Sequence, residues 1–242
     1  MAAKPTLGRY ISTRQVTNRA TRGFCGRSVI RIFYRPFLRG AIACPPTQQE
    51  ETTMSTQDDM RLADRFQIEQ AMLRYCRGVD RKEWDWVRAA YHPDAFDDHG
   101  NYKGAIPGFV QSVIDRHQTI EQSTHAINNM LIEFAGPDSA VVETYFHVNQ
   151  RHAPGDAAPY AAIVRGPMPT AKQALEVETI GRYVDHFTRR DGAWKIAHRT
   201  VVFELTRAHA APSGGGLQKN WACAQRNGTD RVQTLRREVG LG

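Results

Sequence analysis

The hydrophobic pattern of this 242-residue chain changes once, near residue 120, from a helical period to a strand period. Before that point apolar residues recur at steps of three and four, which predicts amphipathic helices. The long first helix starts near Asp58 and is marked by Leu62, Phe66, Ile68, Met72, Leu73, Cys76 and Val79. A short helix over about 83–91 ends before Pro93, and a third carries Ile106, Phe109, Val110, Val113 and Ile114. Strands are predicted over about 123–134, 139–151, 174–190 and 193–206.

Three helices followed by a meandering sheet predict an α+β domain. Arg190-Asp191-Gly192 is a strong hairpin signal between the last two strands. A sheet of this kind can curl around the long helix into a cone-shaped α+β barrel, with the helices packed on curved antiparallel strands that enclose a pocket. The Pro- and Gly-rich stretch over 152–172 is long for a loop in a compact domain, and we interpret it as a possible lid.

Charge divides the chain into segments. Residues 1–53 hold nine of the 32 basic residues and two of the 25 acidic ones, so the net charge of +7 lies there. A basic extension of this kind is typical of a transit peptide, which would imply import into an organelle. The alternative is that translation starts at Met54 and that the protein is cytoplasmic. We expect 1–53 to be a disordered basic extension, 54–207 to form the domain, and 208–242 to be a tail with one short helix.

The balanced charge of residues 54–242 argues against nucleic-acid binding by the domain. No apolar run reaches the length of about 18 residues that a membrane helix needs. The four cysteines lack metal-site spacing, so neither zinc nor a disulfide framework is predicted. The local acid–histidine cluster of His92, Asp94, Asp97, Asp98 and His99 could suggest a metal, but it lies in a predicted turn and short strand, and we predict no metal site.

Two residues could perform proton transfer. Asp80 ends the first helix, and His125 lies near the start of the first long strand. A neutral imidazole can act as a base near pH 7, and a carboxylate on its other nitrogen fixes the tautomer and stabilises the imidazolium. The alternatives are ordinary: Asp80 and Glu83 have the spacing of a capping box for the second helix, and a histidine is more often structural than catalytic.

Arg199 is a third candidate, because on the last strand it alternates with Ala197, Val201 and Phe203. The opposite face of that strand would carry Trp194, Ile196, His198, Thr200 and Val202. An arginine among apolar residues either points into a cavity or sits on an exposed sheet edge. The pattern of the strand leaves both options open.

These residues resemble a known family. The motifs that carry the resemblance are Gly78-Val79-Asp80, Tyr102-Lys103-Gly104, Thr124-His125 and Arg189-Arg190-Asp191-Gly192-x-Trp194-Lys195. In this order they resemble the SnoaL-like branch of the nuclear-transport-factor-two superfold, over about 58–207. That branch includes scytalone dehydratase, bile acid 7α-dehydratase and hexachlorocyclohexane dehydrochlorinase, and ketosteroid isomerase is a more distant relative.

The resemblance implies a cofactor-independent enzyme in which a His–Asp dyad removes a proton and a neighbouring group leaves. It matches the dyad to His125 and Asp80, and the assisting groups to Tyr75 and Arg199. Tyrosine at position 75 is similar to the dehydratases rather than to the dehydrochlorinase, which has lysine there. Substrate contacts are expected from Phe96, Trp84, Val201 and Phe203.

We therefore predict a lyase that acts on a small apolar molecule and forms a homodimer or homotrimer through its sheet. Two alternatives stay open. The first is an isomerase in which Asp80 itself shuttles the proton, and the second is a non-catalytic ligand-binding domain.

Overall fold

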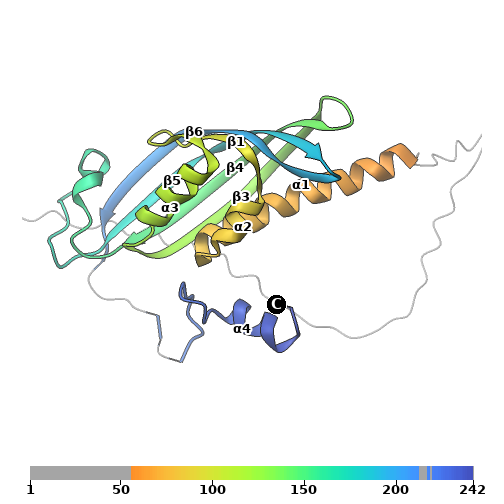
Figure 1. Cartoon of the computed structure of the whole chain (residues 1–242). Helices are drawn as coiled ribbons and strands as arrows, with labels where there is room; N and C mark the ends of the chain where they lie inside the picture. Colours follow the sequence, from red (N-terminus) through yellow and green to blue (C-terminus); the bar gives the residue numbers. More distant parts are fainter. Residues whose placement is uncertain (1–55, 213–216, 219, 242) are drawn as a thin grey trace, which may run out of the picture. The chain divides into compact units, whose positions relative to one another are not determined.

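A six-stranded, strongly curled sheet is the frame of the protein, in a computed structural model that describes residues 56–212, 217–218 and 220–241 (Figure 1). The strands are β1 (Tyr91–Asp98), β2 (Lys103–Ala105), β3 (Ile120–Phe134), β4 (Ser139–His152), β5 (Leu175–Arg190) and β6 (Ala193–Ala210). Their order is β2-β1-β6-β5-β4-β3, so the sheet is open at β2 and β3. The mixed α+β class is confirmed. The sheet is not purely antiparallel, because β1 pairs with β6 in parallel.

Three helices precede β3, as expected, although two short strands separate the second from the third. They are α1 (Thr56–Arg81), α2 (Trp84–Ala89) and α3 (Ile106–Arg116), and Figure 1 shows them on one side of the sheet. A 3₁₀ helix, η1 (Ala158–Ile163), lies between β4 and β5, and α4 (Arg231–Glu238) lies near the C-terminus. No helix among these described residues is long and apolar enough to cross a membrane.

The long helix α1 contacts the core through one stripe of side chains. Ile68, Met72, Tyr75, Cys76 and Val79 are buried at steps of three and four. Three residues that the pattern had included, Leu62, Phe66 and Leu73, are instead exposed because they lie off this stripe. At Gly78 a β-carbon would lie 2.9 Å from the side chain of Val87, so glycine allows α1 and α2 to approach each other closely.

Strand β6 does not alternate regularly. Phe187 pairs with Ile196 and His186 pairs with His198, so Ala197 forms a β-bulge. Consequently Trp194, Ile196, Arg199 and Val201 are all buried, and the prediction that Trp194 and Arg199 face opposite sides is wrong. The hairpin prediction is confirmed, because Asp191 and Gly192 both have the positive φ angles, 52° and 77°, of a type I′ turn.

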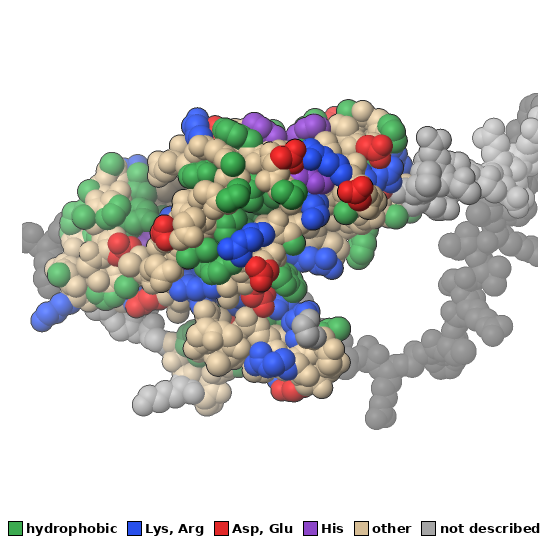
Figure 2. Space-filling model, viewed as in Figure 1, with side chains coloured by type: hydrophobic (Ala, Val, Ile, Leu, Met, Phe, Trp, Pro, Cys, Tyr) green, Lys and Arg blue, Asp and Glu red, His purple; other side chains and the backbone are tan. Residues whose placement is uncertain are grey.

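The domain boundaries remain predictions. The expected basic extension over 1–53 lies outside the described residues. At the other end, β6 continues to Ala210, and the following segment contacts the domain through Arg226. On the face drawn in Figure 2, acidic and basic side chains are interspersed rather than gathered by sign.

Candidate functional site

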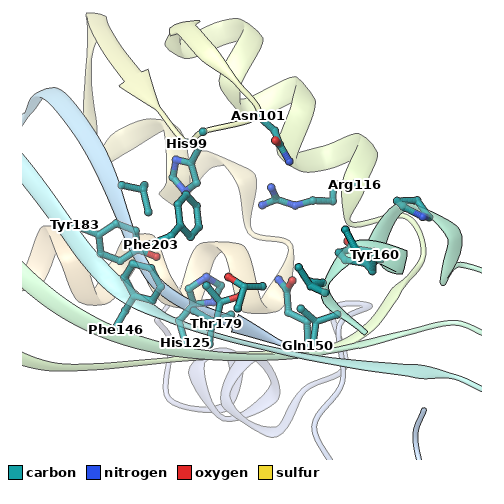
Figure 3. A pocket seen from close by; sticks show the side chains of 18 residues that line it. His99, Asn101, Arg116, His125, Phe146, Gln150, Tyr160, Thr179, Tyr183 and Phe203 are labelled. Carbon is teal, nitrogen blue, oxygen red and sulfur yellow. The ribbon is translucent and has the colours of Figure 1, made fainter. Parts of the chain in front are cut away.

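A cavity of about 460 Å³ lies between the inner face of the sheet, the end of α3 and η1 (Figure 3). Its wall combines apolar and aromatic side chains with polar groups, a mixture that can bind a small molecule and orient it. The polar and titratable residues on the wall are His99, Asn101, Arg116, His125, Gln150, Tyr160, Thr179, Tyr183 and Thr206. In the described part of the chain, no aspartate or glutamate lines it.

His125 lines this cavity, and Asp80 lies behind it. The Nδ1 atom of His125 is 2.7 Å from Oδ1 of Asp80, and the backbone N–H of His125 donates to Oδ2 at 2.8 Å. The Ser123 hydroxyl donates to Oδ1 at 2.8 Å. The predicted hydrogen bond is confirmed, and the capping-box alternative is wrong, since the N-cap of α2 is Glu83 and no side chain caps it.

The surroundings of Asp80 determine the tautomer of His125. Burial favours a raised pKa for this carboxyl, but the hydrogen bonds and charge of His125 and the bond from Ser123 outweigh it and lower the pKa below its usual value. An ionised Asp80 can only accept, so Nδ1 of His125 carries the proton that it donates. In the neutral ring the lone pair is then on Nε2, the atom that a general base would use.

A second His–Asp pair lies at the same cavity. His99, which lines the wall, places Nδ1 2.5 Å from Oδ1 of Asp97, and the hydroxyl of Tyr91 donates to Oδ2 of Asp97 at 2.7 Å. Burial lowers the pKa of His99, Asp97 opposes this shift, and the charges of Arg199 and Arg116 add to it. His99 is therefore neutral near pH 7.

The sequence had marked His99 only as part of a local acid–histidine cluster. The structure distributes that cluster among separate partners: His92 bonds to the Thr188 carbonyl, Asp94 to Arg190, and Asp98 to Lys103. Within the described part of the chain, no group of three potential ligand residues could hold a metal ion. Alternation alone could not find the pair, because Asp97 and His99 meet at the end of a short strand.

Arg199 does not line the cavity. It is fully buried and forms a two-pronged ion pair with Asp185, at 2.7 Å and 2.6 Å. Burial disfavours its charge, but Asp185 outweighs this and raises the pKa of Arg199 well above its ordinary value. Tyr75 is buried under the same guanidinium, which lies 4.4 Å from its ring, and Tyr75 is also absent from the wall. The structure thus keeps both predicted assisting groups away from a direct substrate contact.

Two tyrosines, Tyr160 and Tyr183, line the wall, and the sequence analysis missed Tyr183 as a candidate. The Arg199 guanidinium lies 4.1 Å from the ring centroid of Tyr183, and Phe146 packs on it at 4.5 Å. Burial raises its pKa well above the ordinary value, so it stays protonated. The inward face of β5 carried the missed signal, because Tyr183 alternates there with Asp185 and Phe187.

Half of the predicted substrate contacts lie on the cavity wall. Val201 and Phe203 line it. Phe96 instead stacks on His198 at 5.2 Å on the other face of the sheet edge, and Trp84 packs edge-on against His117 at 5.9 Å. Phe96 is exposed on β1 and Trp84 packs beside His117 at the start of α2, so neither side chain lines the cavity. The expected lid segment does contribute to the wall, through η1 residues such as Tyr160 and Ile163.

Behind Asp80 the C-terminal segment supplies an arginine. Arg226 donates to the carbonyls of Asp80 at 2.7 Å, Val79 at 3.0 Å and Ile120 at 2.5 Å. It also donates to Nδ1 of the buried His117 at 2.6 Å. This arginine ties the end of α1 to the start of β3, the two elements that hold the dyad together.

The profile of the SnoaL-like domain matches residues 60–200 of the chain. No curated protein shows significant sequence similarity to it.

Solved structures agree with this match. A protein from Novosphingobium aromaticivorans assigned as a scytalone dehydratase aligns with a TM-score of 0.50 and 19% identity, covering 66% of this chain and 99% of that one. A type 2 hexachlorocyclohexane dehydrochlorinase aligns with a TM-score of 0.52 and 16% identity, covering 68% and 99%. The LinA-type3 dehydrochlorinase from Novosphingobium barchaimii gives 0.50 and 18%, covering 64% and 99%. At these identities the likeness establishes a shared fold and no more.

Proposed function

Because the chain belongs to the SnoaL-like domain family, we propose that it is a cofactor-independent lyase, of the dehydratase or dehydrohalogenase type, for an apolar small molecule. One observation carries the proposal: a histidine on the cavity wall whose Nδ1 is held by a buried carboxylate at 2.7 Å. That geometry leaves a basic nitrogen directed away from the carboxylate, on a wall that combines apolar and polar side chains.

In the proposed reaction Nε2 of His125 takes a proton from a carbon next to an activating group. The electron pair of that C–H bond forms a double bond while the bond from the adjacent carbon to its leaving group breaks. A leaving hydroxyl takes the proton of Tyr183 and departs as water, and the imidazolium returns its proton to the tyrosinate through solvent. A leaving halide needs no proton, so the imidazolium then releases its proton to solvent.

The other groups have supporting roles in this proposal. Asp80 orients His125 and stabilises its cationic form. The neutral His99, with Nδ1 bonded to Asp97, can accept a hydrogen bond from a substrate hydroxyl through Nε2. Arg199 acts at one remove, because its guanidinium packs on the ring of Tyr183 and positions that hydroxyl.

The test is turnover of cyclic β-hydroxy ketones and chlorinated cyclohexanes, followed by mass spectrometry for the loss of water or of hydrogen chloride. His125→Ala should lower the rate by about 10²–10⁴ without unfolding the protein. Asp80→Asn should also lower the turnover rate strongly. Tyr183→Phe should slow the loss of water but not the loss of chloride. The exposed histidine of β5 supplies the matched control, His186→Ala, which should retain wild-type activity.

The same variants separate the alternatives. An isomerase would give products of unchanged mass and depend on Asp80 but not on His125. A binding protein would turn over none of these compounds. Near-wild-type turnover by His125→Ala would refute the proposed base.

A further inference from the structure

Among the residues that the structure describes, Arg116 is the only permanently charged side chain on the cavity wall. It ends α3, and Figure 3 shows it extended into the cavity beside Asn101. The remaining polar neighbours on this side of the wall are uncharged, among them Gln150 and Tyr160. The cavity therefore has one cationic corner and, elsewhere on its wall, apolar side chains.

Arg116 is an exposed residue, so its charge is open to solvent as well as to the cavity that it lines. Within the described ranges no carboxylate lies within ion-pairing distance of it, and none lines the cavity. The two histidines of the wall and the buried arginine near it are paired: His125 with Asp80, His99 with Asp97, and Arg199 with Asp185. A cation in the last turn of a helix is favourable in itself, but that reason does not explain why it projects into a cavity.

We propose that the cavity binds substrates that carry a carboxylate, and that Arg116 is the residue that holds this group. A guanidinium presents two parallel N–H donors that match a carboxylate, and it retains its charge at any physiological pH. One arginine balances one negative charge, which favours a carboxylate over a doubly charged phosphate. The apolar wall around Phe146, Val177 and Val201 would take the ring system of the same molecule.

This inference names the substrate class of the site proposed above, so it rests on that site being a ligand pocket but not on its chemistry. Binding of the carboxylate would fix one end of the substrate at α3 while His125 approaches it from β3. Arg116 would then determine which carbon faces the base.

Isothermal titration calorimetry of the full chain with 2-naphthoate and 2-naphthamide tests the inference, because the two probes differ only in charge and hydrogen-bonding at one group. Wild-type protein should prefer the carboxylate by roughly tenfold, with the preference falling as salt is raised. Arg116→Gln should abolish the preference and Arg116→Lys should retain part of it. Arg88→Gln, which removes an exposed arginine of α2 paired with Asp85, is the matched charge control and should change nothing.

Equal affinity of the wild type for the two probes, binding of neither, or a preference that survives in Arg116→Gln would overturn the inference. Tighter binding of 2-naphthyl phosphate than of 2-naphthoate would overturn the assignment to carboxylates. His125→Ala should keep the preference intact. Failure of the lyase proposal and failure of this inference are therefore distinguishable, since turnover reports the first and the probe preference in an inactive variant reports the second.

Discussion

His117 should make the stability of the protein fall steeply between pH 7 and pH 5. Its side chain is fully buried, with Arg226 donating to Nδ1 and the Trp84 ring packed against it. Burial and, to a lesser extent, nearby positive charges together lower its pKa to about 2. The charged or titratable groups that contribute are Arg116 of α3, Arg226 of the C-terminal segment, His125 of β3 and Lys82 after α1.

The magnitude follows from linkage. In the unfolded chain His117 protonates below its ordinary pKa of about 6.5, whereas in the folded chain it stays neutral throughout this range. The unfolded state therefore binds more protons, and stability is lost as the pH falls below about 6.5. Each pH unit costs about 1.4 kcal/mol, so the change from pH 7 to pH 5 should remove about 2 kcal/mol through this residue.

Urea unfolding monitored by tryptophan fluorescence at the two pH values measures the loss. His99 and His152 also have pKa values lowered by burial. The free energy of unfolding of the wild type should therefore fall, between pH 7 and pH 5, by more than His117 alone contributes. In His117→Gln the loss should be smaller than in the wild type by about 2 kcal/mol, whatever the variant costs at pH 7. His186→Gln, at an exposed position of β5, should lose as much as the wild type. An equal loss in His117→Gln and the wild type would refute the reasoning.

Two further predictions concern buried arginines. Arg226→Met leaves three backbone carbonyls without their donor, so urea unfolding should show a loss of about 3 kcal/mol in stability. The control Arg237→Met, on the exposed side of α4, should lose little stability. Equal losses in the two variants would contradict the role given to Arg226. Asp185→Asn should cost about 3–5 kcal/mol, because it leaves the fully buried Arg199 charge unpaired. The double variant Asp185→Leu with Arg199→Met should recover much of that stability, and no recovery would argue against an uncompensated charge as the cause.

The local sequence pattern was sufficient to predict most of the helices and strands. The change of period near residue 120 located α1, α3 and the four long strands, and Asp191-Gly192 determined the hairpin. These features depend on which face of a segment is apolar and on which residues accept a positive φ. The sequence pattern did not distinguish the short strands β1 and β2 from a turn. A three-residue or irregular strand has too few alternating residues to be detected.

The positions of side chains relative to the cavity depended on the bulges of the sheet. One extra residue at Ala197 turns Arg199 to the same side as Trp194, into the interior, where Asp185 of the neighbouring strand pairs with it. A one-residue shift changes the face of every following side chain, and nothing in the alternation of β6 itself records where such a shift occurs. The packing of α1 under Arg199 likewise keeps Tyr75 off the wall, whereas Tyr183 of β5 lines it.

The sequence by itself determined the helix-then-strand order and the α+β class, because these follow from hydrophobic period and turn chemistry. The pairing of Asp80 with His125 was implied by the resemblance to the SnoaL-like family, since the residues alone left other roles open. Only the tertiary structure decided which groups gather around the cavity: the His99–Asp97 pair at the end of β1, Arg116 at the end of α3, and Arg226 of the C-terminal segment behind the dyad. These residues come from elements far apart in the chain, and contacts of that kind are set by the packing of whole elements rather than by any local pattern.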